Sequence, residues 1–158
     1  MIQQFNQNFS DKSAVLKIIG SGEQENYLKN KYSSQKVIFL GKLFNDDLIA
    51  EFINSSCFVC PSEFEPWGLV VNEALSSALP VITTKEVGAG FDLIVSKETG
   101  LVANNMDEFG ECMLHLYNDA DLLLRFSKNA SDLMRNHWNY ALYDKCLQDA
   151  IKKVEQWQ

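Results

Sequence analysis

Two glutamates with seven residues between them, Glu65 and Glu73, are the side chains of this sequence best suited to bind a ligand. Glu65 lies in a loop that follows an apolar, strand-like run, and Glu73 lies early in the helical pattern after it. If the ligand contains a ribose and phosphates, the carboxylate of Glu73 could accept two hydrogen bonds from adjacent ribose hydroxyls. Glu65 could then reach the group on the other side of the ligand's phosphates. In an arbitrary sequence both acids would more often be solvated side chains, so their context has to decide.

The residues between the two glutamates favour a ligand that carries phosphate. Pro66 fixes the backbone directly after Glu65, and Gly68 allows the chain to pass close to a ligand. If the helix begins near Gly68, the amides of Leu69 and Val70 are among its N–H groups that lack a helical acceptor, and such groups suit a phosphate. In proteins of alternating strands and helices, ligands bind beyond the carboxyl ends of the strands, which is where this loop lies.

A second glycine-bearing turn, Gly20-Ser21-Gly22, also follows a strand-like run. It resembles the start of a dinucleotide-binding fingerprint, but Glu25 occupies the position of the third glycine. Glu23 and Glu25 would both repel a pyrophosphate, so a plain strand-to-helix turn is favoured. A dinucleotide-dependent oxidoreductase is therefore the least favoured hypothesis for the function of this chain.

The cysteines favour buried, reduced thiols over a zinc site. Four are present: Cys57, Cys60, Cys112 and Cys146. Cys57 and Cys60 form the only close pair, and three residues apart in a strand they point to opposite faces. His115 and His137 lie far away in helical patterns, and no second CxxC pair exists. No metal and no cofactor is expected.

The length and composition predict one soluble domain over residues 1–158. Its 46% hydrophobic and 22% charged residues are ordinary for a globular protein. The net charge of −7 argues against a nucleic-acid partner. No apolar run approaches the roughly 18–20 residues of a membrane-spanning helix, and the amino terminus is unlike a signal peptide. A cytoplasmic location is expected.

Five apolar runs predict strands that alternate with helices. The runs are Val15–Ile19, Val37–Leu40, Cys57–Cys60, Pro80–Thr84 and Thr99–Val102. The segments between them have helical patterns, including a polar helix over Glu23–Lys31, a helix capped by Asn45-Asp46-Asp47 with an apolar face of Leu48, Ile49, Phe52 and Ile53, a helix over Leu69–Ala78 and a helical turn at Asp92–Val95. After Met106 the pattern is helical, ending with a segment over Tyr140–Trp157. Short connections and apolar strands predict a Rossmann-like, mostly parallel sheet of about five strands with a helical tail.

The stretch from Pro61 to Leu75 resembles the E-x7-E signature of retaining glycosyltransferases of family 4. The family pattern is a Pro-Ser, then Glu-Pro-Phe-Gly-Leu, then Glu-Ala, and this chain has Trp67 at the Phe position. The resemblance continues upstream through the runs ending at Gly22 and Gly41, and downstream to about Asn118. It implies the carboxy-terminal half of a GT-B enzyme, the domain that binds a nucleotide-sugar donor.

The resemblance also implies a role for each matching residue. Glu73 would hold the ribose hydroxyls, and the amides of Leu69 and Val70 would hold the diphosphate. Glu65 would act at the donor sugar as the catalytic residue, either as a nucleophile or as a positioning group. The remaining donor-binding positions are Pro66, Trp67 and Gly68, and the possible base-binding positions are Lys42 and Leu43. Such enzymes generally need no metal.

The chain departs from the family pattern in two places. The loop Gly88-Ala89-Gly90-Phe91-Asp92 only approximates the family's Gly-Gly followed by Pro-Glu, with Asp92 at the Glu position. The family's first strand in this domain, with its Arg and Lys, has no counterpart here. That strand lies between those represented by Val15–Ile19 and Cys57–Cys60, so we expect these two to pair directly, or a second chain to fill the gap.

The leading hypothesis is therefore the donor-binding domain of a larger, two-domain retaining glycosyltransferase that builds a polysaccharide or glycoconjugate. The absent amino-terminal domain would recognise the acceptor, and the whole enzyme would be cytoplasmic or peripheral at the inner face of the membrane. Alone, the chain is expected to bind a nucleotide diphosphate weakly and to transfer no sugar. The alternative is a non-catalytic α/β module for assembly or regulation.

Overall fold

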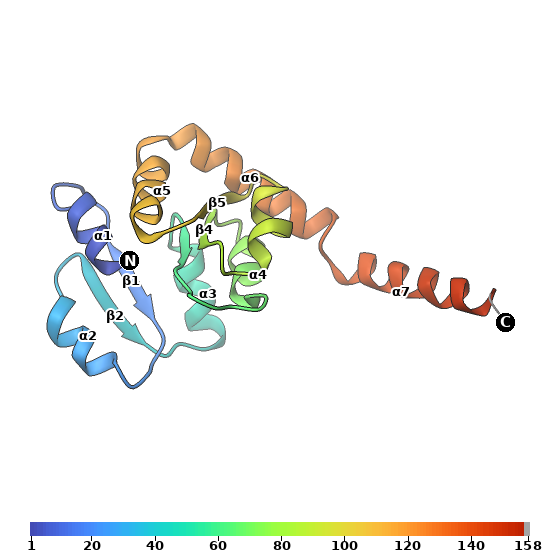
Figure 1. Cartoon of the computed structure of the whole chain (residues 1–158), viewed down its shortest axis with the longest axis horizontal. Helices are drawn as coiled ribbons and strands as arrows, with labels where there is room; N and C mark the ends of the chain where they lie inside the picture. Colours follow the sequence, from blue (N-terminus) through green and yellow to red (C-terminus); the bar gives the residue numbers. More distant parts are fainter. Residues whose placement is uncertain (157–158) are drawn as a thin grey trace.

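The computed structural model describes residues 1–156, in which strands and helices alternate along the chain (Figure 1). The strands are β1 (Leu16–Ile19), β2 (Val37–Gly41), β3 (Phe58–Cys60), β4 (Val81–Thr84) and β5 (Gly100–Ala103). The helices are α1 (Ile2–Asn8), α2 (Glu25–Tyr32), α3 (Asn45–Ile53), α4 (Leu69–Ser76), the π-helix η1 (Gly90–Val95), α5 (Met106–Asn118), α6 (Ala120–Asn136) and α7 (Tyr140–Glu155). All five predicted strands are present, each within two residues of its predicted bounds, and the α/β class is confirmed.

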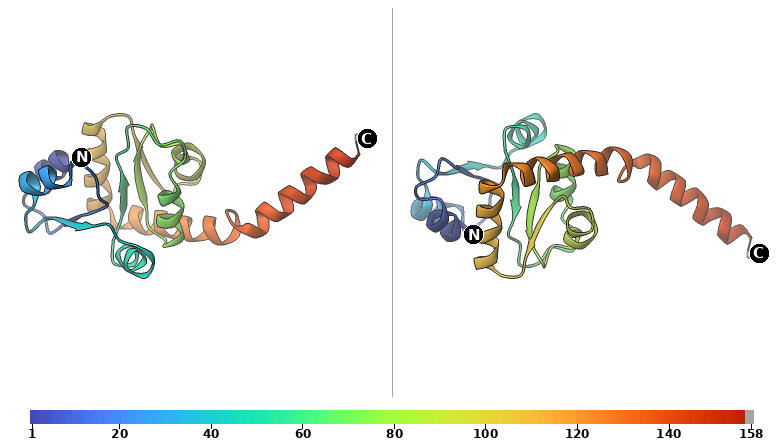
Figure 2. Two further views of the ribbon diagram at one scale, coloured as in Figure 1. Left: turned by 90° about the horizontal axis from the view of Figure 1, so that it is seen from below. Right: turned by 90° about the horizontal axis from the view of Figure 1, so that it is seen from above.

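The strands form two parallel sheets instead of one. β1 pairs with β2 from Leu16 opposite Val37, whereas β4 lies between β3 and β5. Figures 1 and 2 show the β1–β2 pair beside the three-stranded sheet but not continuous with it. The prediction that β1 pairs directly with β3 is wrong. Side chains of both sheets meet in a shared core against α1 and α5, which holds the sheets together without a backbone ladder between them.

Each face of the three-stranded sheet is covered by its own core. Val81 of β4 packs with residues of α4, η1 and α6, and its neighbour Ile82 packs on the other face with residues of α1 and α5. β4 is buried along its whole length, and its four residues, Val81 to Thr84, are all β-branched. Cys60 belongs to the first core and Cys57 contacts the second, which confirms that they point to opposite faces.

Helix α3 differs from its prediction at its start and on its apolar face. It begins at Asn45 itself, with a φ of 47°, and its N-cap Phe44 makes no side-chain capping bond, so the predicted cap is wrong. Asp46 and Asp47 lie in the first turn, where carboxylates interact favourably with the helix dipole. Phe52 is buried, but Ile49 and Ile53 are exposed because only a narrow stripe of α3 meets the core.

Helix α7 extends away from the body of the domain (Figures 1 and 2). None of its residues is buried, although Leu147, Ile151 and Val154 recur at helical spacing along it. The helix was predicted to reach Trp157, which lies outside the described residues. Within residues 1–156, no helix combines the length and apolar character needed to cross a bilayer.

Candidate functional site

The loop from β3 to α4 carries Glu65 and is fixed by the chain that follows β4. The Glu65 N–H donates to the carbonyl of Glu86 at 3.1 Å, and the Gly88 N–H donates to the carbonyl of Glu65 at 2.9 Å. The Thr84 hydroxyl also donates to the carbonyl of Ser62, nearer the start of the loop. Glu65 therefore sits in a short parallel bridge to Val87, and its backbone position does not depend on its side chain.

Two glycines allow these two segments to approach each other. Gly68 has a φ of 92°, and a Cβ there would lie 3.2 Å from Cγ of Glu65 and from Cγ1 of Val87. A Cβ at Gly88 would lie 2.0 Å from the carbonyl oxygen of Pro66, closer than any real contact. The sequence indicated a need for glycine at position 68. It did not indicate that Gly88 lies against the backbone of Pro66.

Helix α4 begins at Leu69, as predicted, with Gly68 as an N-cap that has no side chain. The Val71 N–H donates to the carbonyl of Gly68 at 2.8 Å. Among residues 1–156, the N–H groups of Leu69 and Val70 have no hydrogen-bond acceptor. These two amides, at the positive end of the helix, are available to an anion.

The two glutamates flank these amides from the loop and from the helix. Glu65 is half-buried and Glu73 is exposed, one turn beyond Leu69 on α4. Val71 and Ala74 on the same helix are fully buried, which turns Glu73 away from the core. Within the described chain neither carboxylate has a hydrogen-bond or ion-pair partner, so both are available to a polar ligand.

Trp67 is held by a backbone hydrogen bond, by its indole N–H and by the stacking of its ring. Its carbonyl accepts the Ala89 N–H at 2.9 Å, and its Nε1–H donates to Oδ1 of Asn72 at 2.9 Å. Its ring stacks on Trp138, with centroids 5.8 Å apart and an interplanar angle of 13°. The sequence predicted Trp67 as a donor-binding position but missed Trp138, because nothing local links a residue between α6 and α7 to this loop.

The predicted base-binding residues belong to the other sheet. Lys42 and Leu43 follow β2, and the Lys42 ammonium lies over the ring of Phe44, 4.8 Å from its centroid. Lys42 is exposed and Leu43 is half-buried. The structure thus joins Glu65 through Val70 and Glu73 in one loop and helix, whereas Lys42 and Leu43 lie on a separate element.

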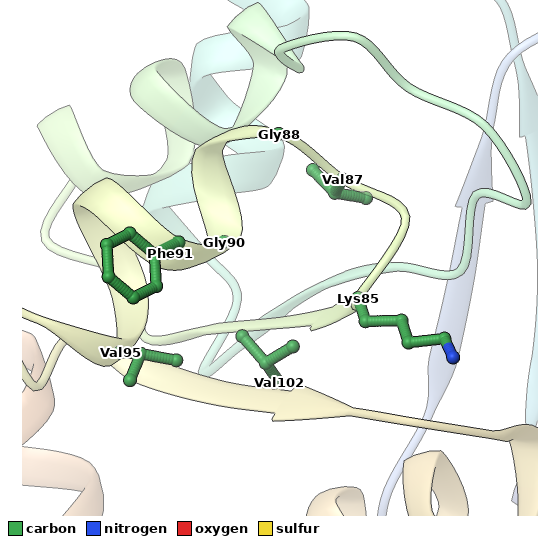
Figure 3. A pocket seen from close by; sticks show the side chains of 7 residues that line it. All are labelled: Lys85, Val87, Gly88, Gly90, Phe91, Val95 and Val102. Carbon is green, nitrogen blue, oxygen red and sulfur yellow. The ribbon is translucent and has the colours of Figure 1, made fainter.

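A cavity of about 310 Å³ lies at the chain segment that fixes the Glu65 loop. Its lining residues are Lys85, Val87, Gly88, Gly90, Phe91, Val95 and Val102 (Figure 3). In Figure 3, Phe91, Val95 and Val102 gather on one side while the Lys85 side chain extends to the other. Asp92, at the family's Glu position, is exposed in the first turn of η1. Lys85 carries no local sequence signal that marks it as part of a site.

The cysteines are free, and their surroundings differ. Burial raises the pKa of the Cys57 thiol to about 12, and burial also raises the pKa of Cys112. These thiols are therefore protonated and unreactive near neutral pH. The prediction of buried thiols is confirmed for Cys60, whereas Cys57 and Cys112 are half-buried and the prediction is wrong for Cys146, which is exposed on α7. In the part of the chain that the structure describes, no three His, Cys, Asp or Glu side chains gather as metal ligands would.

Solved structures with the same fold are glycosyltransferases of the GT-B type. Anabaena HepE in complex with UDP-glucose matches with a TM-score of 0.77 at 18% identity, over 96% of this chain and 44% of HepE. The C-terminal domain of LpcC, a glycosyl transferase group 1 family protein from Francisella tularensis, matches with a TM-score of 0.70 at 22% identity, over 88% of this chain and 77% of that one. The chain therefore has the fold of a GT-B C-terminal domain.

Sequence comparison then identifies the family. The protein-family model described as glycosyl transferases group 1 matches residues 1–133, so the chain belongs to this family of glycosyltransferases. The sulfoquinovosyl transferase SQD2 of Arabidopsis thaliana is 36% identical over 87 residues, 55% of this chain and 17% of SQD2. The poly(glycerol-phosphate) alpha-glucosyltransferase of Bacillus subtilis is 28% identical over 142 residues, 82% of this chain and 21% of that enzyme. The chain spans well under half the length of these relatives.

Proposed function

We propose that this chain is the donor-binding domain of a retaining glycosyltransferase that uses a nucleotide-diphosphate sugar. The observation that carries the proposal is the pair of unpaired amides at Leu69 and Val70, flanked by the free carboxylates of Glu65 and Glu73. HepE, which has the same fold, is described in complex with UDP-glucose. Membership of the glycosyltransferase family supports the same class of donor.

In the proposed complex, the diphosphate lies at the start of α4 and accepts hydrogen bonds from the amides of Leu69 and Val70. Those amides, with the helix dipole, stabilise the charge that develops on the leaving diphosphate. Glu73 accepts hydrogen bonds from two ribose hydroxyls, because a carboxylate presents two oxygens in one plane. Glu65 contacts the donor sugar, and Gly68 allows the close approach of the backbone. Lys42 and Leu43 are proposed to contact the base.

No metal enters this proposal, because the helix terminus provides the positive end for the diphosphate. A helix terminus carries only about half an elementary charge, so binding to this chain alone is expected to be weak. The cationic groups that complete the site would come from the family's first strand of this domain, and the groups that recognise the acceptor from a further domain of a longer enzyme. That enzyme would build a polysaccharide or glycoconjugate, in the cytoplasm or at the inner face of the membrane.

Two surfaces are proposed as the places where the rest of the enzyme makes contact. One is the apolar stripe of α7, including Leu147 and Ile151, which no other element of the described chain covers. The other is the space between β1 and β3, whose facing edges lack a strand partner within residues 1–156. An added strand there would satisfy both edges, and a second copy of the chain is the other source of one.

The direct test is titration calorimetry of the chain with UDP, GDP and ADP. We expect weak binding of at least one of them, and a loss of at least about 10-fold in affinity on Glu73→Ala, since hydrogen bonds to a charged group contribute about 1.5–3 kcal/mol. Glu63→Ala, which removes another exposed acid of the same loop, is the matched control and should bind as the wild type does. Equal affinity for all three proteins would remove the ribose role of Glu73.

The alternative is a non-catalytic module that keeps the fold for assembly or regulation. The separation of the two sheets favours it, since the family's central strand would be needed for a continuous sheet. A longer form of the protein with an upstream domain should transfer sugar from a nucleotide sugar and lose most turnover on Glu65→Ala. Normal turnover in that variant would remove the proposed role of Glu65, and no turnover with any donor would favour the module.

A further inference from the structure

We propose that Trp138 is a positioning residue for the donor-binding loop, which it holds in place by stacking on Trp67. This inference rests on the proposed function, because it concerns the loop that presents Glu65 and the α4 amides. The two indoles are 5.8 Å apart between centroids and nearly parallel at 13°. Offset stacking of this kind contributes beyond the apolar area that it buries.

Trp67 is the residue through which such a contact can act on the site. It immediately precedes Gly68, the N-cap of α4, and so sets the direction in which the chain enters the helix. Its carbonyl accepts the Ala89 N–H, and its indole N–H donates to Asn72 on α4. A displaced Trp67 would therefore disturb both the bridge to the chain after β4 and the first turn of α4.

Trp138 is anchored by backbone bonds at the junction of α6 and α7. Its N–H donates to the carbonyl of Leu133 at 2.8 Å, and Leu133 is buried in the core that Trp67 packs against. The next residue, Asn139, caps α7 by accepting the Leu142 N–H at 3.0 Å, and its amide donates to the carbonyl of Arg135 at 2.7 Å. The backbone that carries the Trp138 indole is therefore held in place by hydrogen bonds at the junction of α6 and α7.

A purely structural role is the competing explanation, and exposure argues against it. Trp138 is 40% exposed, and it is not among the residues of either core. Its most specific contact is with a residue of the candidate site. The structure therefore assigns it an effect on the loop that is larger than its effect on the fold.

The loop can be followed without any ligand, through amide hydrogen exchange. The Gly88 and Ala89 N–H groups donate to the carbonyls of Glu65 and Trp67, whereas the Val81 N–H donates to Thr99 within the core. In Trp138→Ala, exchange at Gly88 and Ala89 should rise between about 2-fold and about 10-fold, the range for loss of an aromatic pair. Exchange at Val81 should be unchanged.

Two further variants complete the experiment. Trp138→Phe keeps an aromatic ring and should restore most of the protection at Gly88 and Ala89. Tyr140→Ala removes a neighbouring aromatic side chain that is 92% exposed, and it should exchange as the wild type does. Unchanged exchange in Trp138→Ala, or an equal rise at Val81, would overturn the proposal, the second result because it would show a general loss of stability.

Titration of the same proteins with UDP separates this inference from the proposed function. If UDP binds the wild type, Trp138→Ala should weaken binding by about the factor seen in exchange, and Trp138→Phe should restore it. Unchanged UDP binding together with faster exchange at Gly88 and Ala89 would show that the loop moves without affecting the site, and would overturn the positioning role. If no nucleotide diphosphate binds the wild type, the proposed function fails, while the exchange data still decide whether Trp138 holds the loop.

Discussion

The two sheets of this domain differ in how completely they are covered. In the three-stranded sheet, β4 is buried from Val81 to Thr84, with a helical layer on each face. In the β1–β2 pair, Leu16 and Val37 meet the core, but Ile19 and Ile38 are exposed. Helix α2, which connects these two strands, buries none of its residues. The candidate site follows β3, so it is built on the sheet whose central strand, β4, is fully buried.

The difference shows that one chain can form a rigid site and still leave part of its fold unfinished. The backbone of the Glu65 loop is held by hydrogen bonds from β4 and from the chain after it. The predicted base-binding residues Lys42 and Leu43 directly follow β2, the second strand of the β1–β2 pair. We therefore expect perturbations to act on the donor loop and on the β1–β2 pair independently.

The largest expected effect is from an added methyl group at Gly88. Gly88→Ala places Cβ against the carbonyl of Pro66, so one segment must move, at a cost of about 2–3 kcal/mol in the free energy of unfolding. Gly22→Ala, in the loop after β1, is the matched control, because a Cβ there meets nothing within 4 Å. It should change stability by less than about 0.5 kcal/mol. Urea unfolding measures both, and equal effects would contradict the close approach at Gly88.

Local stability should differ between the sheets in the same direction. The Val81 N–H, bonded to Thr99, lies in the doubly covered sheet, whereas the Leu16 N–H, bonded to Lys36, lies in the partly exposed pair. Native-state hydrogen exchange should be slower at Val81 by at least about 10-fold, because opening the β1–β2 pair exposes less buried surface. Equal protection would mean that the two sheets unfold as one unit and would remove the comparison.

The smallest expected effect is from the ion pair that joins the β1–β2 pair to α3. Lys17 Nζ lies 2.6 Å from Oε2 of Glu51, and both side chains remain partly exposed. Lys17→Met should cost about 0.3–1 kcal/mol, less in high salt, because solvent screens the pair. The measurement is urea unfolding at low and high ionic strength. A larger loss that does not depend on salt would indicate that Lys17 also helps to close the open edge of β1.

The strands and most of the site could be predicted from the sequence, for physical reasons. Each strand is a short run rich in apolar or β-branched residues, so the five runs were recognisable. The start of α4 was predictable because Pro66 fixes the backbone and Gly68 permits a positive φ just before it. The split between the sheets was not, since an unpaired edge has the same local sequence as a paired one. The exposure of Ile49 and Ile53 was missed because apolar spacing does not give the width of the surface that a helix meets.

Contacts between distant segments account for the rest of what was missed. The glycines at positions 88 and 90 were visible as a loop, but only the fold brings Gly88 against Pro66. Trp138 follows a long helix and carries no local sign of its stacking on Trp67. Both features lie around the candidate site and determine how firmly its loop is held.

The central claim is that the start of α4 binds the diphosphate of a nucleotide. The most direct measurement is an NMR titration of the chain with UDP, followed through the backbone amides. We predict that the largest shifts occur at Leu69, Val70 and Glu73, with little change at Gly20 and Gly22. Shifts centred on Gly20 and Gly22, or no shifts at Leu69 and Val70 at saturating UDP, would contradict the account.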